Sequence, residues 1–150
     1  MPVRVAWCQP GEKAPVALRS EGAAVSTAGI EMLVPATAAN VPAVRASLSR
    51  FIDRNWPEAV RDGPDIALAV TEACTNAVQH AYPTGTGDMT ITGRIGDHHL
   101  TVRVTDRGGG MTAPSRNPGM GVGLKLIHAL AEATITSTTR GTTVKLRFAL

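Results

Sequence analysis

Three polar side chains recur at four-residue spacing in the segment VTEACTNAVQHAY, residues 70–82: Glu72, Asn76 and His80. In a helix of 3.6 residues per turn, this spacing gives a stripe that drifts slowly around the axis, so all three side chains can face one site. A carboxylate one turn from a side-chain amide pairs a proton acceptor with a neutral oxygen ligand for a hard cation such as Mg²⁺. An ordinary solvated helix face would show the same spacing.

A carboxylate followed by three glycines ends an alternating run in VTDRGGGM, residues 104–111. Asp106 can accept a hydrogen bond from the exocyclic amino group of adenine, which guanine replaces with an oxo group, so this residue would select ATP over GTP. Gly108, Gly109 and Gly110 allow positive φ and let a flat ring approach the backbone. The simpler alternative is an Asp-Gly turn that closes a hairpin, although three glycines exceed what such a turn requires.

A second glycine-rich segment, NPGMGVGLKLI at residues 117–127, leads into a predicted helix. Gly119, Gly121 and Gly123 would expose backbone N–H groups at the positive end of the helix dipole, which suits a phosphate. The segment is not a phosphate loop with a Lys-Ser/Thr ending, because Leu124 follows the last glycine. It is not a dinucleotide-binding turn either, because no parallel βαβ unit surrounds it.

The polar segment TAPSRNP, residues 112–118, lies between the two glycine-rich segments and can fold over a ligand as a lid. Arg116 within it is either a phosphate contact or a solvated loop side chain. The sequence leaves both interpretations open.

Hydrophobic periodicity predicts the strands that must position these residues. Alternation over 30–34 indicates one strand, and alternation over 89–95 and 99–106 indicates a hairpin joined by GDH. A second hairpin is predicted from 134–139 and 143–148, which are joined across an Arg-Gly turn.

Three helices are predicted from apolar residues at helical spacing. The first follows Asn40, a potential N-cap, with Pro42 in its tolerant first turn. The second begins at Pro64, runs to about Ala81 and carries the polar stripe. The third covers residues 122–132.

The resulting order, β-α-α-β-β-loop-α-β-β with strands in adjacent pairs, favours an α+β fold in which helices pack on one face of a mostly antiparallel sheet. A chain of 150 residues suits a single domain. We expect this domain to span residues 30–150. Residues 1–29 are rich in Pro, Gly and small side chains and are expected to form a flexible tail, in which a short strand around Val3 to Trp7 stays open.

The composition is that of a globular protein, with 43% apolar and 18% charged residues. Cys8 and Cys74 are too few for a disulfide framework, so reduced cysteines and a cytoplasmic location are expected. No segment is long and apolar enough to span a membrane. The net charge of +3 invites a nucleic-acid interpretation, but the basic residues are scattered and have no aromatic residues interleaved with them.

The three motifs, in this order, resemble the ATP-binding domain shared by gyrase, a heat-shock chaperone, histidine kinases and MutL, known as the histidine-kinase-like or Bergerat type. The resemblance covers about residues 30–149 and rests on E-x-x-x-N-A-x-x-H-A, D-x-G-x-G and G-x-G-x-G-L. In its small size and in the segment TEACTNAVQHAY, the chain is most similar to the RsbW-like anti-sigma factor serine/threonine kinases of bacteria. This family implies a two-layer α/β sandwich.

The resemblance also implies residue roles. Glu72 would be the general base, Asn76 would coordinate Mg²⁺, Asp106 would bind the adenine amino group, and Thr142 would assist at the adenine end. His80 matches the motif, but we expect a structural role for it, because a His late in a helix commonly caps or packs. The full predicted nucleotide-binding set is Asn76, Asp106, Gly108, Gly110, Arg116, Gly119, Gly121, Val122, Gly123, Leu124 and Thr142.

The family therefore implies a protein kinase that uses ATP and Mg²⁺ to phosphorylate a Ser or Thr of an anti-sigma factor antagonist. The kinase would also sequester a sigma factor and form a homodimer, with no direct role for nucleic acid or a membrane. One alternative is an ATP-gated binding module without phosphotransfer. A histidine-kinase fragment is disfavoured, because all four histidines lie within the predicted domain.

Overall fold

The computed structural model describes residues 4–8, 28–57, 59, 62–82, 85–96, 98–109 and 118–149, and gives the backbone alone for 4–8 and 118–122. The strands are β1 (Arg4–Cys8), β2 (Gly29–Pro35), β3 (Asp88–Ile95), β4 (His99–Asp106), β5 (Glu132–Thr138) and β6 (Gly141–Ala149). The helices are a 3-10 turn η2 (Ala38–Asn40), α1 (Val41–Asn55), α2 (Gly63–His80) and α3 (Pro118–Leu130).

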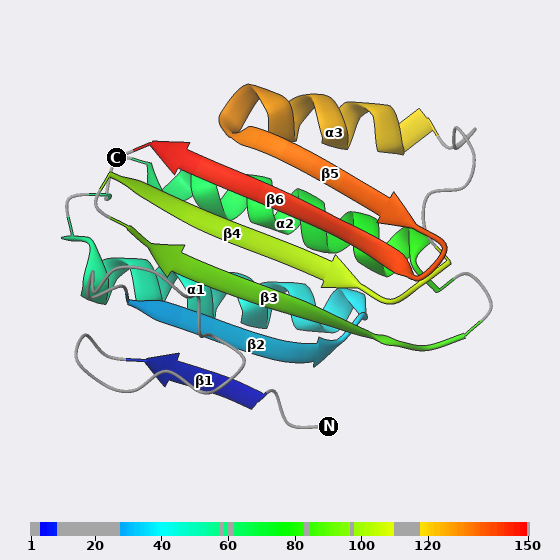
Figure 1. Cartoon of the computed structure of the whole chain (residues 1–150), viewed down its shortest axis with the longest axis horizontal. Coiled ribbons are helices and arrows are strands. Elements are labelled where there is room, and N and C mark those ends of the chain that lie inside the picture. The colour runs from blue at the N-terminus through cyan, green and yellow to red at the C-terminus, as the bar shows by residue number, and fades with distance from the viewer. Residues whose placement is uncertain are drawn as a thin grey trace.

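The six strands form one sheet in the order β1-β2-β3-β4-β6-β5, and every neighbouring pair is antiparallel. The three α-helices lie on one face of this sheet, with α1 behind β2 and β3, α2 behind β4 and β6, and α3 beside β5 (Figure 1). The predicted α+β architecture, a two-layer α/β sandwich with helices on one face, is confirmed.

The core lies between the helices and the sheet. Helix α1 contributes Val44, Leu48 and Phe51, which recur on one face at helical spacing. Helix α2 contributes mainly small side chains, such as Ala69 and Ala73, so its backbone can approach the sheet closely. None of the helices in the described ranges has the length and apolar character needed to cross a membrane.

Strand β1 lies inside the range expected to be a flexible tail. It pairs with β2 at the edge of the sheet, from Arg4 opposite Leu33 to Cys8 opposite Gly29. The expectation of a loose tail is therefore wrong for these five residues, and the open option of a strand near Val3 to Trp7 describes them better. The five residues of β1, RVAWC, have no apolar–polar alternation and lie in a Pro- and Gly-rich context, so periodicity could not identify the strand.

Asn40 occupies the N-cap position of α1 but does not cap the helix with its side chain. Its Nδ2 donates instead to the backbone oxygen of Pro35 at 2.9 Å and to Thr37 Oγ1 at 3.0 Å. The predicted capping role is wrong, because this amide ties the helix start to the end of β2.

Cys74 provides a test of the core. The side chain is fully buried on α2, and this burial raises the pKa of its thiol from 9.0 to about 12. In a Cys8→Ser background we expect no reaction with a thiol reagent at about pH 8 in the native state, because the thiolate is the reactive form. Full reaction is expected in denaturant. Since the folded-state pKa is raised, stability should also fall as the pH rises above 9.0.

Rapid modification of native Cys74 would contradict the packing of α2 on the sheet.

Candidate functional site

The polar stripe on α2 is present as predicted. Asn76 is only 8% exposed, and Glu72 and His80 are half-buried. Among the described residues, Asn76 Nδ2 and His80 Nε2 are buried without a hydrogen-bond partner. A buried polar atom without a partner costs roughly 1–3 kcal/mol, so two of them one turn apart indicate a place that a polar ligand completes.

Helix α3 meets this stripe at Gly123. A Cβ built on this buried glycine would lie 3.0 Å from Glu72 Oε2 and 3.6 Å from Asn76 Oδ1. Two of the sequence motifs are therefore brought together in space. The absence of a side chain at Gly123 lets α3 approach the carboxylate and the amide closely.

The glycine-rich segment before this contact is helical, which differs from the expected loop. Helix α3 begins at Pro118, so Gly119 and Gly121 lie in its first turn, where backbone N–H groups have no partner within the helix. Their backbone N–H groups therefore lie at the positive end of the helix dipole, and their role as phosphate ligands stays a prediction. The amides of Gly123 and Leu124 lie further along, where they bond within the helix. Pro118 suits the first position of a helix, which explains the early start.

Asp106 forms the second part of the site, at the end of β4. The side chain is 8% exposed, and its Oδ1 accepts hydrogen bonds from the backbone N–H groups of Gly108 at 3.0 Å and Thr142 at 3.3 Å. Thr142 Oγ1 lies 3.0 Å from Ser137 Oγ. No described residue bonds to Oδ2, so one carboxylate oxygen is fixed and the other can accept a further donor. The structure thus brings Thr142 beside Asp106, as the resemblance implied.

Two glycines bring Asp106 close to the end of the polar stripe. A Cβ on Gly108 would overlap the backbone of Ala81, which directly follows His80. Gly141 has a φ of +141°, and a Cβ there would overlap the carbonyl oxygen of Asp106. Both positions require glycine, so the turn after β4 closes against the C-terminal end of α2, and the start of β6 closes against the end of β4.

Tyr82 is a positioning residue beside the candidate site, and its role could not be recognised from the motifs. Its hydroxyl donates to the backbone oxygen of Asp88 at 2.6 Å and accepts from the N–H of Arg107 at 2.9 Å, and its ring occupies the space beside Gly87. The side chain thereby joins the end of α2 to β3 and to the residue after Asp106. The available signal was that this chain's single tyrosine directly follows the helix that carries the stripe.

The remaining predicted residues cannot be placed in the same way. Gly110 and Arg116 lie outside the described residues, and so does most of the predicted lid. Val122 lies in α3, where only its backbone is described. These assignments stay predictions.

The residues present fit a nucleotide with Mg²⁺. The described residues hold no group of three or more His, Cys, Asp or Glu placed to bind a metal ion by themselves. Mg²⁺ commonly takes only one or two protein ligands together with substrate phosphates, so a single Asn76 oxygen, which lies beside α3 at Gly123, suits such a complex.

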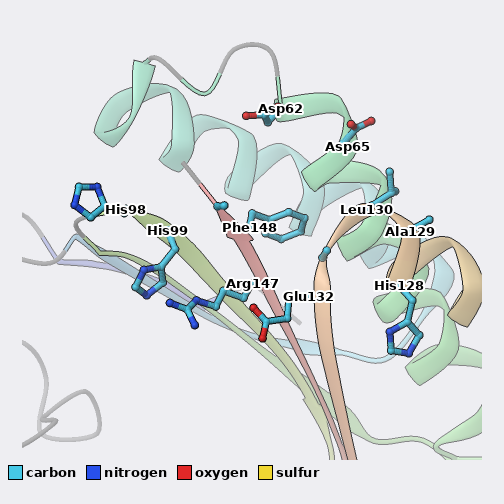
Figure 2. A pocket seen from close by; sticks show the side chains of 12 residues that line it. Asp62, Asp65, His98, His99, His128, Ala129, Leu130, Glu132, Arg147 and Phe148 are labelled. Atoms are coloured by element: carbon cyan, nitrogen blue, oxygen red, sulfur yellow. The ribbon is translucent and has the colours of Figure 1, made fainter.

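A separate cavity of about 600 Å³ lies at the opposite end of the sheet (Figure 2). Asp62 and Asp65 from the start of α2 form one side, and His99 and Arg147 from the strands form the other. None of the predicted site residues lines it. The length of β4 separates this cavity from Asp106, a distance of roughly 24 Å at the rise of an extended strand.

A methyl group at position 123 tests the contact between α3 and the polar stripe. The added Cβ would crowd Glu72 Oε2, so the carboxylate must shift. Alanine favours a helix by roughly 0.5–1 kcal/mol over glycine, so Gly123→Ala should keep or raise the melting temperature. We expect Mg-ATP affinity, measured by calorimetry, to fall about tenfold.

Gly63→Ala is the matched control, because nothing lies within 4 Å of its added Cβ, and its affinity should be unchanged. Wild-type affinity in Gly123→Ala would contradict the site.

Comparisons with known proteins agree with this geometry. Serine-protein kinase RsbW of Bacillus mycoides (strain KBAB4) and of Bacillus cereus (strain ATCC 10987 / NRS 248) are each 38% identical over 79 residues, which is 53% of this chain and 49% of the relative. The chain thus spans about half the length of these relatives.

The histidine kinase domain of the blue-light activated histidine kinase from Erythrobacter litoralis EL346 has a similar fold. The TM-score is 0.54 at 25% identity, covering 85% of this chain and 69% of that one. Residues 34–148 match the family model of the histidine kinase-like ATPase domain. The motif residues Glu72 and Asn76 of α2 lie next to Gly123 of α3, and Gly108, after Asp106, meets the end of α2. Because the family model also matches most of its length, the chain belongs to the histidine kinase-like ATPase domain family.

Proposed function

We propose that this chain is an ATP-dependent protein serine/threonine kinase of the anti-sigma factor type. It phosphorylates an anti-sigma factor antagonist, sequesters a sigma factor, and acts in the cytoplasm as a homodimer. The similarity to proteins named serine-protein kinase RsbW supports the activity. The observation that supports the proposal most strongly is the meeting of Glu72, Asn76 and Gly123, where a carboxylate and an amide on α2 face a position of α3 that has no side chain.

Nucleotide binding follows from the chemistry of each group. Asp106 Oδ2 accepts a hydrogen bond from the adenine amino group, while hydrogen bonds from two backbone N–H groups hold Oδ1 in place. Gly119 and Gly121 direct backbone N–H groups at phosphate oxygens. Asn76 would hold Mg²⁺ through its side-chain oxygen, and at that position the bound ion would supply charge neutralisation for the phosphates.

Phosphotransfer depends mainly on positioning and charge neutralisation. Glu72 accepts the proton of the attacking Ser or Thr hydroxyl while that oxygen bonds to the γ-phosphorus. The bond from the γ-phosphorus to the bridging oxygen breaks, and ADP leaves with the bond's electron pair. Glu72 is suited to this step because its carboxylate is only half-buried and lies one turn from the proposed metal ligand.

Removing the proton acceptor separates catalysis from binding. We expect Glu72→Gln to retain Mg-ATP affinity but to lose phosphate transfer to a Ser or Thr of candidate antagonists by about a hundredfold or more. Transfer of γ-labelled phosphate and calorimetric titration give the two readouts.

Asp65→Asn, which changes an exposed carboxylate on the same helix, is the control and should transfer at the wild-type rate. If wild type and Glu72→Gln both bind ATP and neither labels any candidate, the kinase assignment fails and the ATP-gated binding module replaces it.

The base-recognition role of Asp106 is tested by Asp106→Asn. Asparagine keeps an oxygen that can accept hydrogen bonds from the amides of Gly108 and Thr142. Its NH₂ group is a donor, so it cannot pair with the adenine amino group but can donate to the guanine oxo group. We expect the preference for ATP over GTP to fall about 10- to 100-fold, measured by competitive titration. Asp53→Asn on α1 should leave the preference unchanged. An unaltered preference in Asp106→Asn would remove this residue from the adenine site.

A further inference from the structure

The face of the sheet that no described helix covers carries a group of basic side chains. Val144, Leu146 and Phe148 of β6 are buried toward the helices. Lys145 and Arg147 alternate with them, are exposed, and therefore point to the opposite face. The helices occupy only one side of the sheet (Figure 1), so these two side chains lie on its uncovered side.

The antiparallel register gathers further basic residues around this pair. Arg103 of β4 lies directly opposite Lys145, and Thr101 lies opposite Arg147. Arg94 of β3 lies opposite Thr101 on its other side. Direct cross-strand partners have Cβ atoms about 4.5–5.5 Å apart, and diagonal neighbours about 7–8 Å apart. Four basic side chains therefore lie on three adjacent strands, and we name this group the basic face.

The centre of the basic face is not neutralised within the sheet. The other cross-strand partners of Arg103 and Lys145 are the neutral residues Thr92 and Thr134. Glu132 lies directly opposite Arg147, and Figure 2 shows these two side chains as neighbours. Glu132 lies only diagonally from Lys145 and two strands away from Arg103. Like charges directly opposite each other on a sheet are destabilising. The Arg103–Lys145 pair therefore costs stability, and the described residues give no compensating contact.

We propose that the basic face is a docking surface for an acidic patch on a protein partner. Such a patch would place carboxylates beside Arg103 and Lys145, whose other direct cross-strand partners are neutral. Opposite charges that meet across an interface favour this partner over others. The cluster spans three strands, roughly 10 Å across at the usual strand spacing, which matches a few carboxylates rather than an extended polymer.

A protein fits this face better than a nucleic acid does. Among the described outward-facing side chains of β2 to β6 there is no Phe, Tyr or Trp on which bases could stack. Glu31 on β2 and Glu132 on β5 stand on the two flanks of the cluster and would repel a continuous run of phosphates. A second copy of the chain is also disfavoured, because face-to-face pairing would oppose cations to cations.

The basic face and the proposed nucleotide site lie on opposite sides of the sheet. The side chain of Asp106 is buried on the helix-covered side, whereas Arg103, three residues earlier on the same strand, points away from the helices. A docked partner therefore leaves the nucleotide site open. The inference does not depend on phosphotransfer, and it holds for a chain that only binds ATP.

The test uses a fluorescently labelled oligoglutamate peptide as the acidic probe and the full chain as the protein. Arg103→Gln/Lys145→Gln removes the central pair. Arg45→Gln/Arg50→Gln removes the same charge from exposed positions on α1 and is the matched control. We expect the peptide to bind the wild-type protein at low salt. Its affinity for the sheet variant should be about tenfold lower, and its affinity for the control variant should lie within about twofold of the wild-type value.

Added salt should weaken wild-type binding, because screening acts on exposed charges. The sheet variant should melt at the same temperature as wild type or higher, because it has lost a like-charge contact.

Equal weakening in both variants, or no peptide binding by wild type, would overturn the proposal. Tighter binding of a single-stranded oligonucleotide, lost in the sheet variant, would assign the face to nucleic acid instead. Sedimentation that shows a dimer broken only by the sheet variant would assign it to a second copy of the chain.

Discussion

The close approach of α3 to the polar stripe of α2 is the contact on which the site depends. It is possible because Gly123 has no side chain: a single Cβ there would crowd Glu72 and Asn76. The small residues of α2 let the same helix lie close to β4 and β6, which brings Asp106 to its C-terminal end. One helix therefore shares in both halves of the site, and its packing on both sides positions the carboxylate and the amide.

Much of this arrangement could be predicted from the sequence, because it follows from local periodicity. The four-residue spacing placed Glu72 and Asn76 on one face of a helix, and alternation placed Asp106 at the end of a strand. The contact with Gly123 could not be derived in this way, since it depends on how two helices pack and on the helix starting at Pro118. Strand β1 was too short for its pattern to outweigh its context.

The basic face shows the same limit more clearly. In the sequence, Arg94, Arg103, Lys145 and Arg147 are scattered among neutral residues, and their spread argues against a charged surface. The strand register alone brings them together, because β4 pairs with both β3 and β6. A charge distribution that is even along the chain can thus be concentrated on one face of the fold. The sheet then separates two surfaces of different chemistry, one proposed to bind a nucleotide and one proposed to bind an acidic partner.

The central claim is that the corner between α2, α3 and the end of β4 binds the nucleotide. The most direct measurement is a crystal structure of the chain with Mg²⁺ and a non-hydrolysable ATP analogue. The account predicts the adenine amino group on Asp106 Oδ2, the metal ion on the side-chain oxygen of Asn76, and phosphate oxygens at the first turn of α3. A nucleotide bound elsewhere, such as in the cavity beside His99 and Arg147, would contradict the account.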